Sequence, residues 1–197
     1  KADLLLGTQM VAKGFNFPKV KTVGVVLADT SLNIPDFRAA ERTFALIVQV
    51  AGRAGRFSPD GRVYVQTFRP DSAVIRMAAN GNLAGFYDLE LSARRELGFP
   101  PYARLVRVVF RSKDKAKAAE AAVLFAREAA LVVPADAEIL GPAECPLALV
   151  AGTARWQVIF RSPGIKELHA SLGGLLAAWE PPSSVRVETD VDPVNLM

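Results

Sequence analysis

Two strand-like runs lie near the start of the chain, TVGVVLA at residues 22–28 and GRVYVQT at residues 61–67, and a helical pattern lies between them. The first is a short continuous apolar run, as in a strand buried on both faces of a parallel sheet. Between the runs, residues 35–54 carry apolar side chains at the spacing of an amphipathic helix, with Asp36 as its expected N-cap. Strand–helix–strand alternation with short links predicts a parallel βαβ unit.

The residues before this unit predict one more strand, since Leu4-Leu5-Leu6-Gly7 is another short apolar run. About three strands are then visible, which is fewer than most sheets hold. The chain begins with Lys1 and enters this run almost at once. We therefore expect residues 1–70 to be part of a larger sheet domain, and the chain to be a piece of a longer protein.

The composition is that of a folded globular protein. Of the 197 residues, 51% are hydrophobic and 22% are charged, which excludes a disordered tail, a collagen-like fibre and a coiled coil. No apolar run reaches the roughly 20 residues of a membrane-spanning helix, so we expect no membrane partner. One cysteine and one histidine cannot build a structural zinc site. The lone Cys145 also favours a reducing compartment, and hence the cytoplasm.

The second part of the chain follows a different order. Residues 71–97 predict two helices broken near Gly81, and Phe99-Pro100-Pro101 then ends the helical pattern. Beyond it we expect a ferredoxin-like βαββαβ arrangement, an α+β domain. Its expected strands cover residues 103–111, about 137–141, 155–161 and 185–191, and its expected helices about 114–132 and 165–178. The predicted division is thus residues 1–70, a helical linker at 71–100 and a C-terminal domain at 101–197.

The sharpest chemical signal is QVAGRAGR at residues 49–56. Successive helical residues are about 100° apart, so Gln49, Arg53 and Arg56 fall on one stripe. The same stripe includes two further arginines, Arg38 and Arg42. The glycines of the motif leave room for a ligand to approach closely, and a row of guanidinium groups binds phosphate oxygens through charge-assisted hydrogen bonds. The alternative is a solvated basic face that ends in a glycine-rich helix stop.

A second group of arginines lies on the two strands expected at the centre of the ferredoxin-like sheet. Because side chains alternate along a strand, one set faces the helices and the other lies on the opposite face. That opposite face would carry Arg107, Arg111, Arg155 and Arg161. We expect an exposed platform that binds DNA phosphates with little sequence preference. The alternative is that these arginines pack on other parts of the protein or pair with Glu188 and Asp190 nearby.

Two motifs resemble those of a known enzyme family. QVAGRAGR is similar to motif VI of superfamily-two helicases, and GTQMVAKGFNFP at residues 7–18 is similar to their motif V. Together with DFRAAERTFAL at 36–46 and LGFPPYARL at 97–105, they resemble the PriA family of bacterial replication-restart helicases (primosomal protein N′). The resemblance implies that residues 1–70 are the C-terminal part of a RecA-like helicase lobe, an α/β fold with a parallel sheet.

The resemblance also implies roles at the nucleotide. Arg53 and Arg56 would reach across a cleft to the γ-phosphate of ATP and neutralise charge on the transferred phosphoryl group. Gln49 would help to position them. Gly14 and Asn16, at the end of motif V, would lie near the nucleotide.

A DNA-binding role is implied for other residues of motif V. Thr8 and Gln9 would hold a nucleic-acid phosphate through hydroxyl, amide and backbone N–H groups. Lys13 would add a further phosphate contact. The alternative for Lys13 is a solvated surface lysine.

Several parts of an ATPase are absent from this sequence. It contains no G-x-x-x-x-G-K-[ST] loop, no Asp-Glu pair of a DExH box, and none of the family's zinc-binding cysteines. We therefore expect ATP, Mg²⁺ and zinc to be bound mainly by parts of the protein outside this chain, with no metal site within it. The chain alone is expected to hydrolyse no ATP.

For the intact protein, the resemblance implies an ATP-driven 3′→5′ DNA helicase that recognises stalled forks and starts primosome assembly. The implied partners are branched and single-stranded DNA, single-strand-binding protein and primosome proteins, at the nucleoid in the cytoplasm. Two alternatives stay open. One is another superfamily-two motor such as RecG, and the other is a non-catalytic module that binds DNA or protein.

Overall fold

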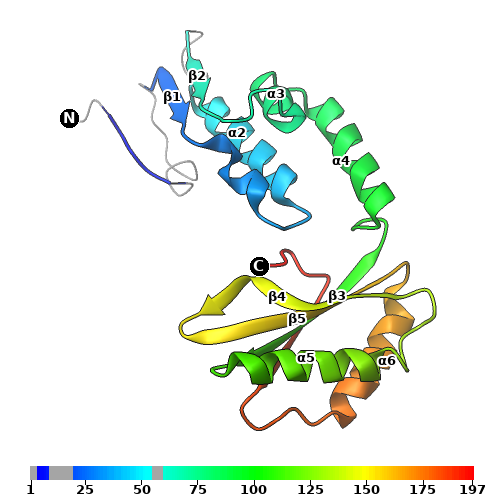
Figure 1. Ribbon diagram of the computed structural model, residues 1–197. Coiled ribbons are helices and arrows are strands. Elements are labelled where there is room, and N and C mark those ends of the chain that lie inside the picture. Colours follow the sequence, from blue (N-terminus) through cyan, green and yellow to red (C-terminus); the bar gives the residue numbers. More distant parts are fainter. Residues whose placement is uncertain (1–3, 9–19, 55–59) are drawn as a thin grey trace. The chain divides into compact units, whose positions relative to one another are not determined.

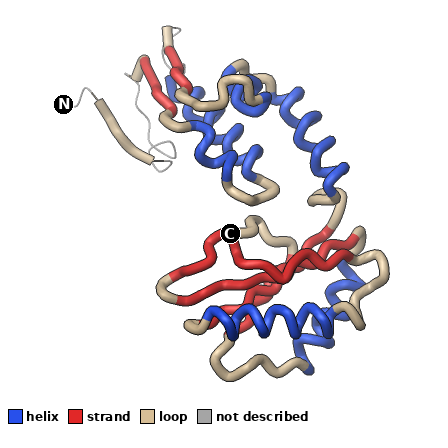
Figure 2. Tube along the Cα trace, viewed as in Figure 1, coloured by secondary structure: helices blue, strands red, loops and turns tan. Residues whose placement is uncertain are grey.

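The computed structural model describes residues 4–8, 20–54 and 60–197, and for Arg53 its backbone alone. Two compact units make up the chain. Unit 1 comprises the residues up to Ile34 together with Arg38–Leu91. Unit 2 comprises Pro35–Phe37 together with Ser92–Met197. Figures 1 and 2 show the helices and strands of each unit.

Unit 1 contains the parallel βαβ unit that the sequence predicts. Its elements are β1 (Thr22–Val25), the 3₁₀ helix η1 (Ala28–Asn33), α2 (Ala39–Ala54), β2 (Arg62–Val65), α3 (Ala73–Ala79) and α4 (Leu83–Leu97), whose last turns belong to unit 2. β1 and β2 pair in parallel, with Thr22 opposite Arg62 and Val25 opposite Val65. The break between α3 and α4 falls at Gly81, as predicted, where the backbone has a φ of 64°.

The core of unit 1 confirms the helical spacing of the segment between the strands. α2 buries Phe44 and Ile47, which pack with Val25 of β1 and with the apolar side chains of α3. The ring of Phe44 stacks on that of Phe86 in α4, with centroids 4.0 Å apart. Apolar residues three and four apart therefore form the buried face of α2.

Two predictions for unit 1 differ from the structure. Leu4-Leu5-Leu6-Gly7 forms no strand, and Leu6 is 83% exposed. A strand needs a neighbouring strand to pair with, and the described parallel sheet consists of β1 and β2 alone. The helix begins at Ala39, later than expected. The carboxyl group of Asp36, the expected cap, instead accepts the backbone N–H of Leu196 at 2.9 Å within unit 2.

Unit 2 has the ferredoxin-like order that the sequence predicts. Its elements are β3 (Arg104–Ser112), α5 (Lys115–Ala129), β4 (Glu138–Val150), β5 (Thr153–Ser162), α6 (Ile165–Ala178) and β6 (Arg186–Val191). The strands form one antiparallel sheet in the order β4-β5-β3-β6, with β3 and β5 at its centre as expected. Asp114 caps α5, since its Oδ1 accepts the backbone N–H groups of Ala116 and Lys117.

Both helices of unit 2 cover one face of its sheet (Figure 2). Val106, Val108 and Phe110 of β3, and Val158 and Phe160 of β5, point into this core and are almost fully buried. Aromatic rings from α5 and from the end of α6 complete it, with the centroid of Phe125 5.1 Å from that of Trp179. The alternation predicted along the two central strands is therefore correct.

The other face of the sheet is also covered. Leu105 of β3 and Ile159 of β5 form a small buried cluster with Leu196, close to the end of the chain. Phe37 and Phe99 pack against this cluster, and their rings stack with centroids 5.4 Å apart. Residues after β6 thus return across the sheet, so this face is not open to solvent as the sequence analysis assumed.

Candidate functional site

The described part of the motif, residues 49–54, lies at the C-terminal end of α2, which packs beside β1 and β2 (Figure 1). Gln49 is exposed, and the backbone of Arg53 lies in the last helical turn. Apart from its chain neighbours and its own helix backbone, nothing lies within 4 Å of a Cβ placed on Gly52, so the structure leaves room at Gly52 for a close ligand approach. Arg56 lies outside the described residues, and its predicted role is untested.

The arginine stripe of α2 is interrupted nearer its beginning. The guanidinium of Arg38 forms an ion pair with the carboxylate of Glu41, in which Nε donates to Oε2 at 2.9 Å. A guanidinium that is paired with a carboxylate attracts a phosphate only weakly, because the pair has little net charge. Arg38 therefore does not belong to the row of guanidinium groups that the sequence predicts for binding phosphate.

The predicted residues of motif V are only partly described. Thr8 is exposed and lies in no helix or strand. Gln9, Lys13, Gly14 and Asn16 lie outside the described residues. The roles predicted for these five residues, at DNA phosphates and near the nucleotide, thus stay predictions.

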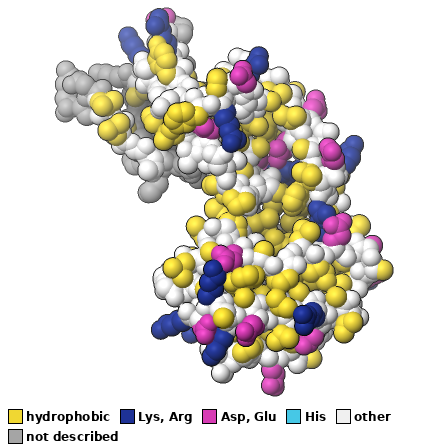
Figure 3. Space-filling view, in the orientation of Figure 1, with side chains coloured by type: hydrophobic (Ala, Val, Ile, Leu, Met, Phe, Trp, Pro, Cys, Tyr) yellow, Lys and Arg dark blue, Asp and Glu magenta, His cyan; other side chains and the backbone are white. Residues whose placement is uncertain are grey.

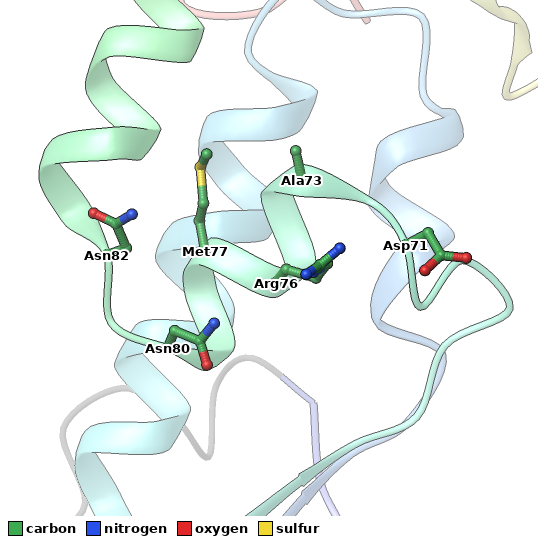
Figure 4. Close-up of a pocket in the computed structure, with 6 residues that line it drawn as sticks. All are labelled: Asp71, Ala73, Arg76, Met77, Asn80 and Asn82. Atoms are coloured by element: carbon green, nitrogen blue, oxygen red, sulfur yellow. The ribbon is translucent and has the colours of Figure 1, made fainter.

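A pocket of about 310 Å³ lies in unit 1, at α3 and the turns on either side of it (Figure 4). It is lined by Asp71, Ala73, Arg76, Met77, Asn80 and Asn82. Its polar groups are in part already used, since Oδ1 of Asn82 accepts the backbone N–H of Gly85 at 3.0 Å near the start of α4. None of the residues predicted to bind nucleotide or DNA lines this pocket, so it is not the candidate site.

The four arginines predicted for one face of the unit 2 sheet do lie on one face. Arg111 is directly opposite Arg155, Arg107 is opposite Ile159, and Arg161 is opposite Leu105 in the β3–β5 register. Directly opposite residues share a face of an antiparallel sheet. On the side of unit 2 that Figure 3 displays, acidic and basic side chains are interspersed. The arginines share a face, but their contacts differ from those of an open platform.

Arg107 is buried, and the prediction of an exposed platform is wrong at this residue. It is only 4% exposed. Its Nε donates to Oε1 of Gln157 at 2.7 Å, and its Nη1 donates to the backbone oxygen of Met197 at 2.8 Å. Nη2 lies 3.5 Å from Sγ of the buried Cys145. The C-terminal residues occupy the space in front of Arg107, where the sequence analysis expected solvent.

The other three arginines are held by partners on neighbouring strands or loops. Arg111 forms an ion pair with Glu188 of β6, N to O 2.7 Å, which is the alternative that the sequence left open. Arg161 pairs with Glu138 of β4, donates to the backbone oxygen of Leu97 and lies over the ring of Phe99. Arg155 donates through Nη2 to the oxygen of Met197 at 3.3 Å, and its Nε is buried without a hydrogen-bond partner among the described residues.

The sequence analysis missed the residues that close this face. Gln157 lies on the expected face, but no local pattern pointed to its bond with Arg107. The only signal for the returning segment was Asp192-Pro193 at the end of β6, where Asp192 has a φ of 51° and its N–H donates to the oxygen of Leu105. Asp192 thus turns the chain back over the sheet.

Asp192 is tied to β3 by an ion pair with Arg104. The hydrogen bond from Arg104 lowers the pKa of the Asp192 carboxyl group below its ordinary value of 3.8, and the N–H of Leu105 acts in the same direction. A lowered pKa means that the folded state favours the charged carboxylate. The resulting stabilisation is fully present above the ordinary value and is lost as the pH falls through the lowered one.

Asp192→Asn is therefore expected to lower the thermal midpoint of unit 2 at about pH 7, and to make no difference at a pH below the lowered pKa of Asp192, where the carboxyl group of the folded parent chain is protonated too. The fluorescence of the two tryptophans measures this midpoint, since Trp156 and Trp179 both lie in unit 2. A difference between the two chains that is the same at both pH values would contradict the role of the charged carboxylate.

The described residues offer neither a metal-binding cluster nor a membrane-spanning helix. No three His, Cys, Asp or Glu side chains lie together there as a metal ion would need. None of the helices described combines the length and the apolar content needed to cross a membrane.

Comparison with known proteins gives consistent matches. Residues 95–194 match the family described as the primosomal protein N C-terminal domain. Over the whole chain, the sequence is 49% identical to the replication restart protein PriA of Treponema pallidum and 40% identical to that of Bacillus subtilis. It is 33% identical over 99% of its length to the PriA of Borreliella burgdorferi. The chain spans 25–30% of the length of these relatives.

Proposed function

This chain belongs to the PriA family, and we propose that it is the C-terminal part of an ATP-dependent DNA helicase that acts in replication restart. The observation that carries this proposal is the similarity of the whole chain, and not of unit 2 alone, to relatives named replication restart protein PriA. The parallel βαβ unit followed by a βαββαβ domain is the order that the apolar patterns of the sequence led us to expect. In this assignment unit 1 belongs to a RecA-like helicase lobe.

Within unit 1, we propose that Arg53 and Arg56 contact the γ-phosphate of ATP and that Gln49 helps to position them. The exposed side chain of Gln49 and the open space at Gly52 are compatible with a nucleotide that approaches the end of α2. A guanidinium there would stabilise the negative charge that spreads over the transferred phosphoryl group. Gly14 and Asn16 would lie near the same nucleotide.

The rest of the nucleotide and metal chemistry belongs, in this proposal, to parts of the longer protein. No phosphate-binding loop is present in the sequence, and the described residues offer no cluster of metal ligands. ATP, Mg²⁺ and zinc would thus be bound mainly outside this chain. The chain alone would hydrolyse no ATP.

The proposed DNA contacts are to phosphates, through Thr8, Gln9 and Lys13 in unit 1. Phosphate contacts release bound counterions, so the affinity for a DNA fork should fall by at least about tenfold between about 50 and 200 mM salt. Binding of a labelled fork to the 197-residue chain measures this. Absence of binding at both salt concentrations would favour the alternative of a protein-binding module.

A pair of lysine variants sharpens this test. Lys13→Ala should lower the slope of log affinity against log salt by about one unit, because one phosphate contact is lost. Lys117→Ala makes the same change at an exposed lysine of α5 and should leave the slope unchanged. Equal slopes for both variants would remove Lys13 from the DNA contacts.

A further inference from the structure

The pocket at α3 lies on a firmly held part of unit 1. Ile75 and Ala78 of α3 are buried in the core of the unit, and Met77, which lines the pocket, packs against the same core. Gly81 ends the helix with a φ of 64°, and the N–H of Asn82 then donates to the oxygen of Met77 at 2.8 Å. The backbone that carries the pocket is therefore fixed by contacts of the chain itself.

The amide group of Asn82 is oriented by the start of α4. Its Oδ1 accepts the N–H of Gly85 at 3.0 Å, and a Cβ at Gly85 would lie only 2.6 Å from its Nδ2. Glycine at this position thus leaves the space that the amide occupies. In Figure 4 the side chains of Asn82 and Met77 lie at the junction of α4 and α3. One wall of the pocket therefore combines an oriented amide with a thioether.

The other polar side chains of the pocket, Asp71, Arg76 and Asn80, are exposed. Within the described ranges, no side-chain hydrogen bond and no ion pair engages any of the three. The opposite charges of Asp71 and Arg76 thus line one pocket without neutralising each other. The pocket offers a carboxylate that accepts hydrogen bonds, a guanidinium that donates them and an amide that does both.

A ligand that satisfies these groups needs an anion, an aromatic ring and an N–H donor. A guanidinium such as that of Arg76 binds phosphate oxygens through charge-assisted hydrogen bonds. The thioether of Met77 suits an aromatic ring, and the carboxylate of Asp71 suits the amino group of a base. A volume of about 310 Å³ is at the small end for a ligand site. The pocket therefore has room for one nucleotide and not for a long ligand.

We propose that this pocket binds one unpaired nucleotide of single-stranded DNA, with the base against Met77, its amino group on Asp71 and its phosphate on Arg76. The inference rests on the DNA-binding function proposed above and adds a base contact to the phosphate contacts proposed there. Bases with an amino group are then preferred. Cytosine has a donor at N4, whereas thymine has an acceptor at O4.

Oligo-dC and oligo-dT of equal length test this preference with the 197-residue chain. Oligo-dC should bind about fivefold more tightly, because it gains one hydrogen bond to an exposed charged group. Asp71→Asn keeps the size of the side chain, but its amide can donate to O4 as well as accept from N4, so the preference should vanish. Equal affinities of the parent chain for both oligonucleotides would overturn the base contact of Asp71.

Arg76→Ala tests the phosphate contact. It should lower the slope of log affinity for oligo-dC against log salt by about 0.7, the value for one phosphate contact in a single strand. Arg127→Ala removes an exposed arginine near the end of α5 and should leave the slope unchanged. Equal slopes for the two variants would overturn the phosphate contact while leaving the DNA function intact. If the parent chain bound neither oligonucleotide, both the pocket and the DNA function would be overturned.

The methyl group of Met77 gives a measurement of the bound state without a substitution in the pocket. The chain has three methionines, so isotope labelling of their methyl groups gives a simple NMR spectrum, in which a Met77→Leu chain identifies the signal of Met77. The ring current of a base that stacks on the thioether should move this signal upfield when oligo-dC binds. An unmoved Met77 signal with oligo-dC bound would overturn the base site.

Discussion

Replacing Arg53 by alanine in the intact protein is expected to lower the rate of ATP turnover by about 10³–10⁵-fold. The physical reason, in the proposed role, is that negative charge on the transferred phosphoryl group would lose a neighbouring cation. The backbone of Arg53 lies in the last turn of α2, whose packing through Phe44 and Ile47 holds it in place. Arg56→Ala should have an effect of the same order.

The measurement is steady-state ATP hydrolysis at saturating DNA, together with the affinity for DNA. Arg53→Ala should lower kcat and leave DNA affinity largely intact. Arg53→Lys keeps the charge but loses the planar, forked donors, so it should restore only a small part of the rate. Arg69→Ala, the loss of an exposed arginine elsewhere in unit 1, is the control and should turn over ATP normally. Unchanged turnover in Arg53→Ala would refute the proposed role.

Phe125→Ala is expected to lower the free energy of unfolding of unit 2 by about 3–5 kcal/mol. Phe125 is fully buried on α5, and its ring lies 5.1–6.2 Å from the rings of Phe110, Phe160 and Trp179. Its removal leaves a cavity that these rings cannot fill without leaving their rotamers. Since a small domain is stable by about 5–15 kcal/mol in total, the loss is a large part of what holds unit 2 together.

Urea unfolding followed by tryptophan fluorescence measures this effect, because both tryptophans of the chain lie in unit 2. Leu124→Ala alters the neighbouring residue of the same helix, which is 49% exposed, and should cost about 1 kcal/mol or less. Helix propensity differs little between the two variants, so the difference between their free energies of unfolding reports the burial of the Phe125 side chain. Equal losses for both would contradict the assignment of Phe125 to the core.

The elements of unit 2 were predictable because they depend on residues close together in the chain. The strands expected at 103–111 and 155–161 are observed as Arg104–Ser112 and Thr153–Ser162. The alternation of apolar and polar side chains along both was sufficient to place the four arginines on the face away from the helices. Likewise, the three- and four-residue spacing of apolar side chains correctly predicted the buried face of α2.

The strand expected at Leu4–Gly7 is not formed, and the spacing of the leucines could not have shown why. A run of leucines can fill a buried strand, but it becomes one only when another strand accepts its backbone hydrogen bonds. The described part of unit 1 pairs β1 with β2, and the leucines stay exposed. An apolar run alone thus predicts that a segment prefers to be buried, but it does not predict which strand the segment pairs with.

Motif spelling indicated the family, and periodicity predicted the βαβ unit and the shared face of the four arginines. Whether that face is open was decided by contacts between residues far apart in the chain. Arg107 meets Met197 across 90 positions, and Asp36 meets Leu196 across 160. Spacing along a strand fixes the direction of a side chain, because the backbone geometry is local. What that side chain meets depends on where the chain returns, which only the packed structure contains.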